Sequence, residues 1–293
     1  MSTMLVNSNL YKKSSKSRKV RCEICANYCK IADGHFGVCR QHKNVNGELF
    51  DESYGIVSSL SPDPIEKKPL HHFLPSTFTY SIGGFGCNMT CLHCQNYMIS
   101  HEYDKYSRGI KITPEAIVEN ALNYNCASIA WTYNEPTIHL PFNKKTSLLA
   151  RKKNLKVIYV TNGYFSQKSV EEILTFVDAF NIDLKSMSPD FYKKVCGADL
   201  DVVLDNIRRV YMEGKHLELT NLIINDYNDS ISEITQLCDF VVNELDNDVP
   251  LHFSRAFPYY KMNDIEPTRP DILYKAREIA IEKGIRNVHL GNI

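Results

Sequence analysis

The stretch Gly84-Phe85-Gly86-Cys87-Asn88-Met89-Thr90-Cys91-Leu92-His93-Cys94-Gln95-Asn96 decides the fold. Its three cysteines have the spacing C-x3-C-x2-C and directly follow a strand-like run over residues 78–82. A loop this short can turn three thiolates onto one iron–sulfur cubane, and three thiolates leave one iron with an open coordination position. An open position on a redox cluster indicates chemistry rather than electron storage alone.

Zinc is the alternative metal at this loop. Because zinc normally takes four protein ligands, the fourth would have to be His93 or a distant residue. The strand-then-loop context favours the cluster over zinc. The glycines that lead into the loop would also let backbone N–H groups approach the cluster sulfides, since glycine permits close approach and positive φ.

Strands and helices alternate from about residue 77 to the end of the chain. Strands are expected over 78–82, 128–133, 157–161, 181–184, 217–224 and 251–255, with a seventh over 287–290. The clearest helix is expected over 230–245, where apolar residues repeat at helical spacing after a capping box of Ser230 and Glu233. This alternation predicts an α/β fold with a parallel sheet, an incomplete TIM barrel of six or seven strand-helix units.

Polar residues gather where the predicted strands end. In such folds ligands bind at the carboxyl ends of the strands, so these residues should converge on one mouth. Purely structural explanations remain open for some of these residues. Glu135 could be a surface carboxylate in a Glu-Pro turn, Asp183 and Lys185 could form an ion pair on the barrel rim, and His252 could be a hydrogen-bonded core residue. The candidates are Tyr133, Asn134, Glu135, Asn162, Asp183, Lys185, Asn221, His252 and Arg255.

A second group of cysteines precedes the predicted barrel, formed by Cys22, Cys25, Cys29 and Cys39. Four thiolates close a tetrahedral site, which suits structural zinc and could equally hold a second cluster. We favour zinc or an unassigned metal over a cluster, and any of these over buried thiols without metal, because the segment has little apolar content. The remaining cysteines, Cys126, Cys196 and Cys238, are expected to be structural.

Composition narrows the class of protein. The 34 basic and 34 acidic residues cancel, so no global field favours nucleic acid or an anionic membrane. No apolar run approaches the length of a membrane span. The ten cysteines of this 293-residue chain, which shows no secretion signal, indicate metal rather than disulfides and a cytoplasmic location. We expect a flexible basic tail over 1–20, the four-cysteine segment and a linker over 21–76, and the barrel core over 77–293.

The cysteine loop resembles that of the radical S-adenosylmethionine (SAM) superfamily, and His93 before the third cysteine also fits that pattern. Further segments extend the resemblance to the pyruvate formate-lyase-activating-enzyme-like branch called AmmeMemoRadiSam system radical SAM enzymes. They cover nearly the whole chain after residue 20: Cys22 to Cys39, Asp63-Pro64-Ile65-Glu66-Lys67-Lys68-Pro69-Leu70, Tyr133-Asn134-Glu135-Pro136-Thr137, Thr161-Asn162-Gly163, Ile182-Asp183-Leu184-Lys185 and Leu251-His252-Phe253-Ser254-Arg255.

The resemblance implies a (β/α)6-like radical SAM core and a [4Fe-4S] cluster on Cys87, Cys91 and Cys94. SAM would chelate the open iron and be cleaved to methionine and a 5′-deoxyadenosyl radical, which takes a hydrogen atom from an unidentified substrate. The implied partners are a low-potential electron donor such as flavodoxin or ferredoxin, and Memo-like and AMMECR1-like proteins.

The resemblance also assigns roles in a SAM pocket. Glu135 would pair with the SAM ammonium, flanked by Tyr133 and Asn134 in place of the glycines of the superfamily's Gly-Gly-Glu motif. Lys185 would meet the SAM carboxylate, while Asp183 binds the ribose or orients the lysine.

Other strand-end residues complete this expected pocket. Asn162 and His93 would reach the cofactor and Asn221 the adenosine, while His252 would transfer a proton and Arg255 would hold an acid. Related activating enzymes hold a monovalent cation with an acidic residue just before Thr-Asn-Gly, and Val160 stands at that position here.

Two other functions stay open from the sequence. One is a glycyl-radical enzyme activase, which would use the same chemistry on a backbone glycine of a partner. The other is a non-catalytic iron–sulfur or zinc scaffold, although a scaffold has no need for Glu135, Asp183 and Lys185 at successive strand ends.

Overall fold

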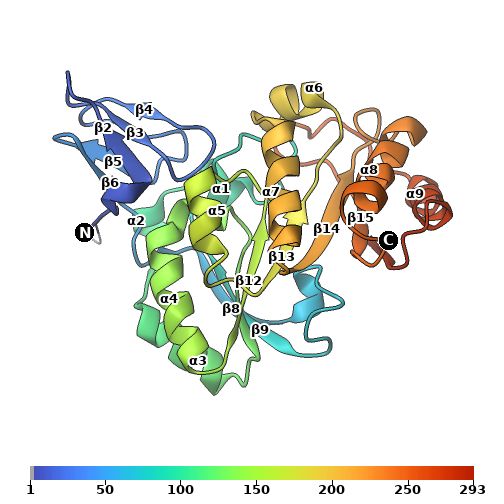
Figure 1. Ribbon diagram of the computed structural model, residues 1–293, viewed down its shortest axis with the longest axis horizontal. Helices are drawn as coiled ribbons and strands as arrows, with labels where there is room; N and C mark the ends of the chain where they lie inside the picture. The colour runs from blue at the N-terminus through green and yellow to red at the C-terminus, as the bar shows by residue number, and fades with distance from the viewer. Residues whose placement is uncertain (1–2) are drawn as a thin grey trace.

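The computed structural model describes residues 3–293, and within them the largest element is one eight-stranded sheet (Figure 1). Its strands are β8 Ser59–Pro64, β9 Phe78–Gly83, β11 Ser128–Thr132, β12 Lys156–Thr161, β13 Ala179–Asp183, β14 His216–Ile223, β15 Leu251–Arg255 and β16 Val288–Gly291. The order across the sheet is β16-β15-β14-β13-β12-β11-β9-β8. All neighbours are parallel except β8, which pairs antiparallel with β9. The predicted α/β partial barrel is confirmed, including its seventh strand.

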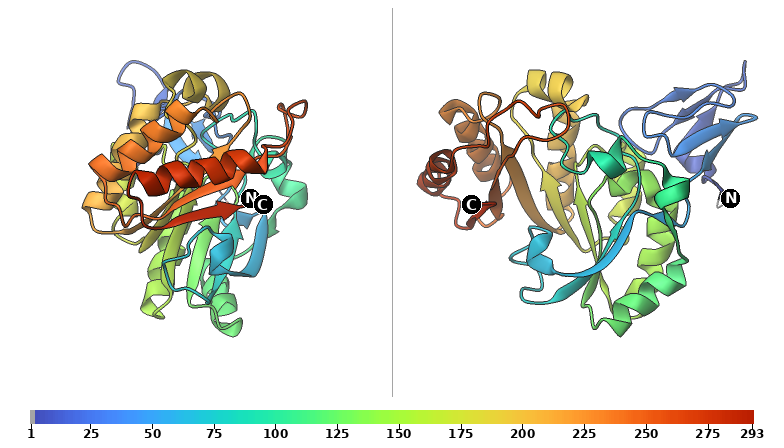
Figure 2. Two further views of the ribbon diagram at one scale, coloured as in Figure 1. Left: turned by 90° about the vertical axis from the view of Figure 1, so that its right-hand side faces the viewer. Right: turned by 180° about the vertical axis from the view of Figure 1, so that it is seen from behind.

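Helices connect the parallel strands and cover the outer face of the sheet (Figures 1 and 2). The longer ones are α3 Pro114–Asn123, α4 Leu140–Lys152, α5 Gln167–Ile173, α7 Leu200–Met212, α8 Ile231–Glu244 and α9 Pro270–Glu282. The capping residue expected for α8 is present, because Ser230 Oγ accepts from the Glu233 N–H at 3.2 Å. Shorter pieces are α1 Tyr97–Ser100, α2 Lys105–Arg108, α6 Pro189–Phe191, η1 Ser8–Leu10, η2 Ile65–Lys67, η3 Pro136–His139 and the π-helix η4 Tyr192–Cys196.

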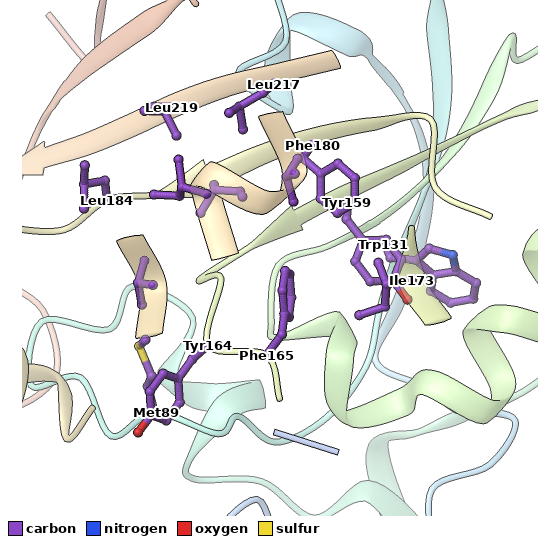
Figure 3. Packing of buried hydrophobic residues seen from close by; sticks show 14 of the residues in the cluster. Met89, Trp131, Tyr159, Tyr164, Phe165, Ile173, Phe180, Leu184, Leu217 and Leu219 are labelled. Carbon is purple, nitrogen blue, oxygen red and sulfur yellow. The ribbon is translucent and has the colours of Figure 1, made fainter. Parts of the chain in front are cut away.

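Aromatic and aliphatic side chains from the strands and helices form the core (Figure 3). Tyr159 of β12 makes edge contacts with Phe176 and Phe180, with ring centroids 5.9 and 6.1 Å apart. Each fully buried side chain of this size contributes about 1.5–3 kcal/mol relative to an exposed one. This packing holds the strand ends, and hence the loops that follow them, in fixed positions.

Residues 3–51 form a small lobe of short strands at one end of the molecule (Figures 1 and 2). Its two sheets have the orders β1-β6-β5 and β2-β3-β4. The strands are β1 Met4–Leu5, β2 Tyr11–Lys13, β3 Val20–Cys22, β4 Lys30–Ile31, β5 His42–Val45 and β6 Glu48–Asp51. A further short strand, β7 Ile56–Val57, pairs with β10 Ile110–Lys111.

Two expected boundaries differ from this structure. The tail expected over 1–20 contributes β1, η1, β2 and the first residue of β3, because Val6, Leu10 and Val20 are apolar and buried. Residues 1 and 2 of that tail lie outside the described residues. The expected linker contains β8, which belongs to the central sheet, so the core begins before residue 77. Across residues 3–293 there is no helix with the length and apolar character needed to cross a membrane.

Candidate active site

A cavity of about 400 Å³ opens where β11 to β15 end. Its lining brings together most of the residues predicted for the site: Cys87, Cys91, His93, Cys94, Tyr133, Asn134, Glu135, Asn162, Asp183 and Lys185. These residues come from the cysteine loop and from three successive strand ends. The structure therefore places the predicted cluster ligands and most predicted cofactor-binding residues around one space.

The cysteine loop is held from one side by the loop that follows β11. Asn134 Oδ1 accepts from the Gly84 N–H at 2.7 Å, and Asn134 Nδ2 donates to the Gly86 carbonyl at 2.9 Å. His139 Nε2 lies 2.9 Å from the Phe85 carbonyl oxygen. Gly86 has φ +86°, the left-handed conformation that glycine adopts without penalty. Asn134 thus acts on the cluster loop as well as lining the cavity.

The π-helix η4 holds the same loop from the other side. The Thr90 N–H donates to the Cys196 carbonyl at 2.8 Å, and the Leu92 N–H donates to the Val195 carbonyl at 3.0 Å. A π-turn leaves backbone groups out of the helical ladder, and such turns are frequent at functional sites. Here the carbonyl groups of η4 are available to fix the loop on both sides of the second cysteine, Cys91.

The three loop thiols have different electrostatic surroundings. A hydrogen bond involving the Cys196 thiol lowers the pKa of Cys91 against the effect of burial, and the Lys185 cation acts in the same direction. Burial raises the pKa of Cys94 to about 11, and it also raises that of Cys87. Cys196, expected to be structural, is buried beside a predicted cluster ligand.

The donor set suits an iron–sulfur cluster. Among residues 3–293 no three Cys, His, Asp or Glu side chains are arranged to hold one metal ion. A cubane keeps its thiolates further apart than a single ion does, because irons and sulfides lie between them. Three thiols that line one cavity beside a cation and a carboxylate therefore fit a cluster with an open position.

Glu135 is buried, and its carboxylate accepts hydrogen bonds from three groups. The donors are the N–H of Thr137 at 2.9 Å, the hydroxyl of Thr161 at 2.9 Å and the N–H of Asn162 at 2.9 Å. Burial nevertheless raises its pKa. Since a carboxylate offers about four acceptor sites, room remains for one further donor from a ligand.

Tyr133 connects the cavity to a buried ion pair. Its hydroxyl donates to Asp63 Oδ2 at 2.5 Å, and Lys68 Nζ lies 2.9 Å from the same carboxylate oxygen. Burial opposes ionisation of Asp63, but the bonds from Tyr133 and Lys68 outweigh it and lower the Asp63 pKa. These contacts fix the segment that carries Lys67 and Pro69 into the cavity wall.

Asp183 and Lys185 form an ion pair of 2.8 Å on the cavity wall. Burial alone would lower the pKa of Lys185, but the negative charges of the Asp183 carboxylate and the Cys91 thiolate outweigh it and raise that pKa. His93 is buried, its pKa is lowered by burial to about 3, and its Nδ1 has no partner within the described residues. The cavity therefore presents a charged lysine and a neutral imidazole.

Three predicted site residues do not line the cavity. Asn221 is buried, and its amide donates to the Leu184 carbonyl at 2.8 Å, because the end of β13 needs that backbone acceptor satisfied. Arg255 Nε donates to the Thr268 carbonyl at 2.6 Å, and its guanidinium lies over the Phe257 ring. Each of these side chains supports a neighbouring backbone segment instead of facing the cavity.

His252, the third, lies deeper in the barrel. Its Nε2 is 2.7 Å from Glu218 Oε2, and Glu218 also accepts from the N–H groups of His71 and His72 at 3.1 and 2.8 Å. Burial disfavours the Glu218 carboxylate, but hydrogen bonds from His216 and His252 outweigh it and lower its pKa. The core-histidine alternative therefore describes His252, which binds the segment after η2 to the sheet.

The N-terminal cysteines lie close together in the lobe. Burial raises the pKa values of Cys22 and Cys25, and the neighbouring Cys39 and Cys29 thiols raise them further. For Cys39, burial raises the pKa to about 11. Apolar residues such as Ile24 and Ile31 are buried beside these thiols, so the segment has more core than its composition indicated.

Several cavity residues were not predicted as ligands. Thr132, Thr161, Thr220 and Ser254 line the cavity from strands, Lys67 lines it from η2, and His101 and Asn292 line it from loops. The rule that places ligands at strand ends could have identified Thr132, Thr161 and Ser254. The paired lysines of the segment 63–70 offered a signal for Lys67. No local pattern indicates His101 and Asn292, because they reach the cavity only through tertiary packing.

Comparisons with known proteins give independent information. Residues 81–241 match the Radical SAM superfamily. The chain is 45% identical over 275 residues to the uncharacterized protein MJ0808 of Methanocaldococcus jannaschii, with 94% of this chain and 82% of that protein covered. It is 22% identical over 156 residues to the (2S)-3-sulfopropanediol dehydratase activating enzyme of Klebsiella oxytoca, with 53% of this chain and 49% of that enzyme covered.

Solved structures share the fold. A radical SAM methyltransferase from Sphaerobacter thermophilus matches with a TM-score of 0.57 and 14% identity, with 74% of this chain and 67% of that chain covered. A domain of a pyruvate-formate lyase-activating enzyme from Bacteroides vulgatus matches with a TM-score of 0.50 and 18% identity, with 56% and 99% covered.

The partial barrel and the three-thiol cavity define a class of iron–sulfur enzymes that bind their cluster on the loop after the first parallel strand. The chain belongs to the radical SAM superfamily, whose match spans more than half of its residues. Membership implies a [4Fe-4S] cluster and SAM as cofactors, and radical SAM enzymes generally take electrons from flavodoxin or ferredoxin.

Proposed function

We propose that this enzyme binds SAM beside a [4Fe-4S] cluster on Cys87, Cys91 and Cys94 and abstracts a hydrogen atom from its substrate. The observation that carries the proposal is the one cavity that gathers these thiols with Glu135 and Lys185. When bound, the cofactors supply the hard chemistry, which is reductive cleavage of the sulfonium to a 5′-deoxyadenosyl radical. The protein supplies binding, orientation and exclusion of water.

Glu135 and Lys185 have opposite charges that match the two ends of an amino acid. Glu135 keeps one acceptor site after its three protein donors, which suits the SAM ammonium. Lys185 uses one N–H on Asp183 and keeps two for a carboxylate. The apolar side chains of Pro69, Val160 and Leu222 in the wall would reduce access of water to the reacting atoms.

The branch and partners are further parts of the proposal. The motifs quoted above support the AmmeMemoRadiSam system, in which this enzyme would act with Memo-like and AMMECR1-like proteins in the cytoplasm. A glycyl-radical activase is the second candidate, and the similarity to the Klebsiella oxytoca activating enzyme favours it. For the four N-terminal cysteines we propose a bound metal, either zinc or a second cluster.

Anaerobic reconstitution with iron and sulfide tests the function. After addition of dithionite and SAM, the wild-type enzyme should form 5′-deoxyadenosine, and Cys91→Ala should form none. Cys238→Ala is the matched control, because Cys238 is a buried cysteine of α8 outside the cavity. Equal yields from wild type and Cys91→Ala would remove the enzyme proposal and leave the scaffold.

Electron paramagnetic resonance separates the two candidate reactions. A glycine-centred radical on a co-encoded large protein, formed only with SAM and this enzyme, would support the activase. Its absence with each glycyl-radical candidate would contradict the activase and leave the AmmeMemoRadiSam assignment.

A further inference from the structure

We infer that the N-terminal lobe is an electron-entry module, in which Cys22, Cys25, Cys29 and Cys39 hold a second [4Fe-4S] cluster that reduces the one at the cavity. The inference rests on the proposed function, because only a cluster that cleaves SAM needs such a supply of electrons. It deepens that function by naming the route and the class of electron donor.

Two facing turns carry the four thiols. The Cys22 N–H donates to the Cys29 carbonyl at 2.9 Å and closes a turn that contains Cys25. Cys39 lies in the second turn, closed where the Gly37 N–H donates to the His42 carbonyl at 2.9 Å. The missing Cβ of Gly37 would stand 3.5 Å from Cys29 Sγ, so the turns pack directly on each other. Four sulfur ligands thus come from two turns in contact.

Asn27 links this thiol group to the loop of the cavity cluster. Its side-chain nitrogen lies 3.7 Å from Cys25 Sγ and donates to the Asn88 carbonyl at 2.6 Å. On the far side, Asn162 Nδ2 lies 2.8 Å from Asn88 Oδ1 and 3.7 Å from Cys87 Sγ. A short chain of polar contacts therefore joins a thiol of one group to a thiol of the other.

A second contact joins the same two groups. The Cys39 carbonyl oxygen lies 2.5 Å from the position that a Cβ on Gly86 would occupy. Gly86 directly precedes Cys87 in the chain. The backbone of the second turn thus touches the backbone of the cavity loop with no side chain between them, and two independent contacts bring the thiol groups together.

Because the lobe touches the cavity loop, a cluster in the lobe could pass electrons to the cavity cluster. Zinc could not do so, since it has no redox chemistry. SAM and substrate occupy the cavity side of the loop, so an external carrier needs another side from which to deliver electrons. In the proposed step the carrier loses one electron to the lobe cluster, which returns to its oxidised state as the cavity cluster is reduced. No proton or group is transferred, and cleavage of the SAM carbon–sulfur bond consumes the electron.

The charge of the lobe indicates the class of carrier. Exposed bases such as Lys16, Lys19, Lys30 and Arg40 form no ion pair within residues 3–293, whereas the acid Glu23 of the lobe is buried. The whole chain has zero formal charge, so this lobe is a local basic surface. A basic surface attracts an acidic protein that carries one electron, and added salt screens that attraction.

Metal content of two complementary variants tests the second cluster. The Cys87→Ser/Cys91→Ser/Cys94→Ser variant, reconstituted anaerobically as the full chain, should keep about four irons of the roughly eight expected for wild type. After dithionite it should show a reduced-cluster resonance that added SAM does not change. One zinc per chain with no iron, or no bound metal, would overturn the inference.

Reduction kinetics test the route. A variant with serine at positions 22, 25, 29 and 39 should keep the SAM-responsive cluster and its cleavage of SAM with dithionite, but reduced flavodoxin should reduce it several-fold more slowly than wild type. In wild type, that rate should fall as salt is added. Equal rates with flavodoxin in both proteins would overturn the route, and if the serine variant does not fold, the iron content of the first variant decides.

The two proposals fail in different ways. If wild type holds and reduces both clusters but forms no 5′-deoxyadenosine, the proposed function fails and the second cluster stands. If the cavity cluster cleaves SAM while the lobe binds no iron, the inference fails and the proposed function stands.

Discussion

Tyr133 has a backbone conformation that usually belongs to glycine, with φ +72°. In the Gly-Gly-Glu motif to which this segment was compared, a glycine stands at that position. Left-handed residues other than glycine cost of order 1–3 kcal/mol and persist where their surroundings determine them. Here the hydroxyl bond to Asp63 and the Lys68 ammonium over the ring hold the side chain.

Tyr133→Phe should lower the free energy of unfolding by about 1 kcal/mol, since it removes one hydrogen bond to a carboxylate that keeps Lys68 as partner. Urea unfolding of the cluster-free protein measures the change. Tyr274→Phe is the control, because Tyr274 is an exposed tyrosine of α9. An equal loss in both variants would contradict the role of the Asp63 bond.

Lys185→Met should weaken SAM binding by about tenfold to a hundredfold, the equivalent of one hydrogen bond to a charged group. Equilibrium binding of SAM to the reconstituted enzyme measures this effect. Lys194→Met changes an exposed lysine of η4 that pairs with Asp190, and it should bind SAM as wild type does. The same dissociation constant in both variants would remove Lys185 from the SAM site.

For single residues, the sequence predicted which residues belong to the site better than it predicted the contacts that these residues make. Asp183 is the last residue of β13, and Glu135 and Lys185 lie within three residues of the ends of β11 and β13, so the strand-end rule placed them at the cavity. His252 does not satisfy that rule, because it is the second residue of β15 and lies three residues before the carboxyl end of that strand. Its ring meets Glu218 below the cavity. No sequence pattern could indicate that Glu218 takes this contact.

The π-helix η4 is one of the elements that hold the cysteine loop. It ends at Gly197, which has φ +67°. A Cβ at Gly197 would collide with Thr90 Oγ1 in the loop between Cys87 and Cys91. The last turn of η4 and the cysteine loop therefore need glycine at this position for two separate reasons.

Gly197→Ala should lower the iron content after reconstitution, because the collision displaces Thr90 and the loop. Gly214→Ala is the matched control, since Gly214 has φ +65° and would have no atom within 4 Å of an added Cβ. It should cost about 1–2 kcal/mol of stability from the left-handed conformation and keep its iron. Equal iron content in both variants would contradict the prediction, because it would show that the collision with Thr90 does not disturb the cysteine loop.

Strands were predictable from the sequence where their apolar pattern extends over enough residues. The parallel strands are buried apolar runs followed by polar turns, and both features are visible in the sequence. The strands of the lobe have at most four residues each, too few for alternation to separate them from a tail. β8 contains two prolines, which disfavour a strand, but its place on the sheet edge tolerates them.

Over the whole molecule, histidines that are buried, such as His139, or half-buried, such as His289, make stability depend on pH. Burial lowers the pKa values of His139 and His289 to about 4. Since the unfolded value is about 6.5, the unfolded chain binds more protons than the folded one between these values. Their contribution is complete above about pH 6.5 and is lost as the pH falls towards 4.

The urea midpoint of the cluster-free protein should therefore fall steadily from pH 6.5 to pH 4.5. His139→Asn should flatten that dependence, whereas His35→Asn, at an exposed histidine, should leave it unchanged. A midpoint that stays constant or rises over this interval would contradict the burial of neutral histidines.

The bonds that Asn134, His139, Val195 and Cys196 make to the cysteine loop all run between protein atoms. Damage by air that strips iron and sulfide from the enzyme would leave these braces in place. Rebuilding the cluster would then require only iron and sulfide. A sample bleached by air should regain its colour under argon without being denatured first.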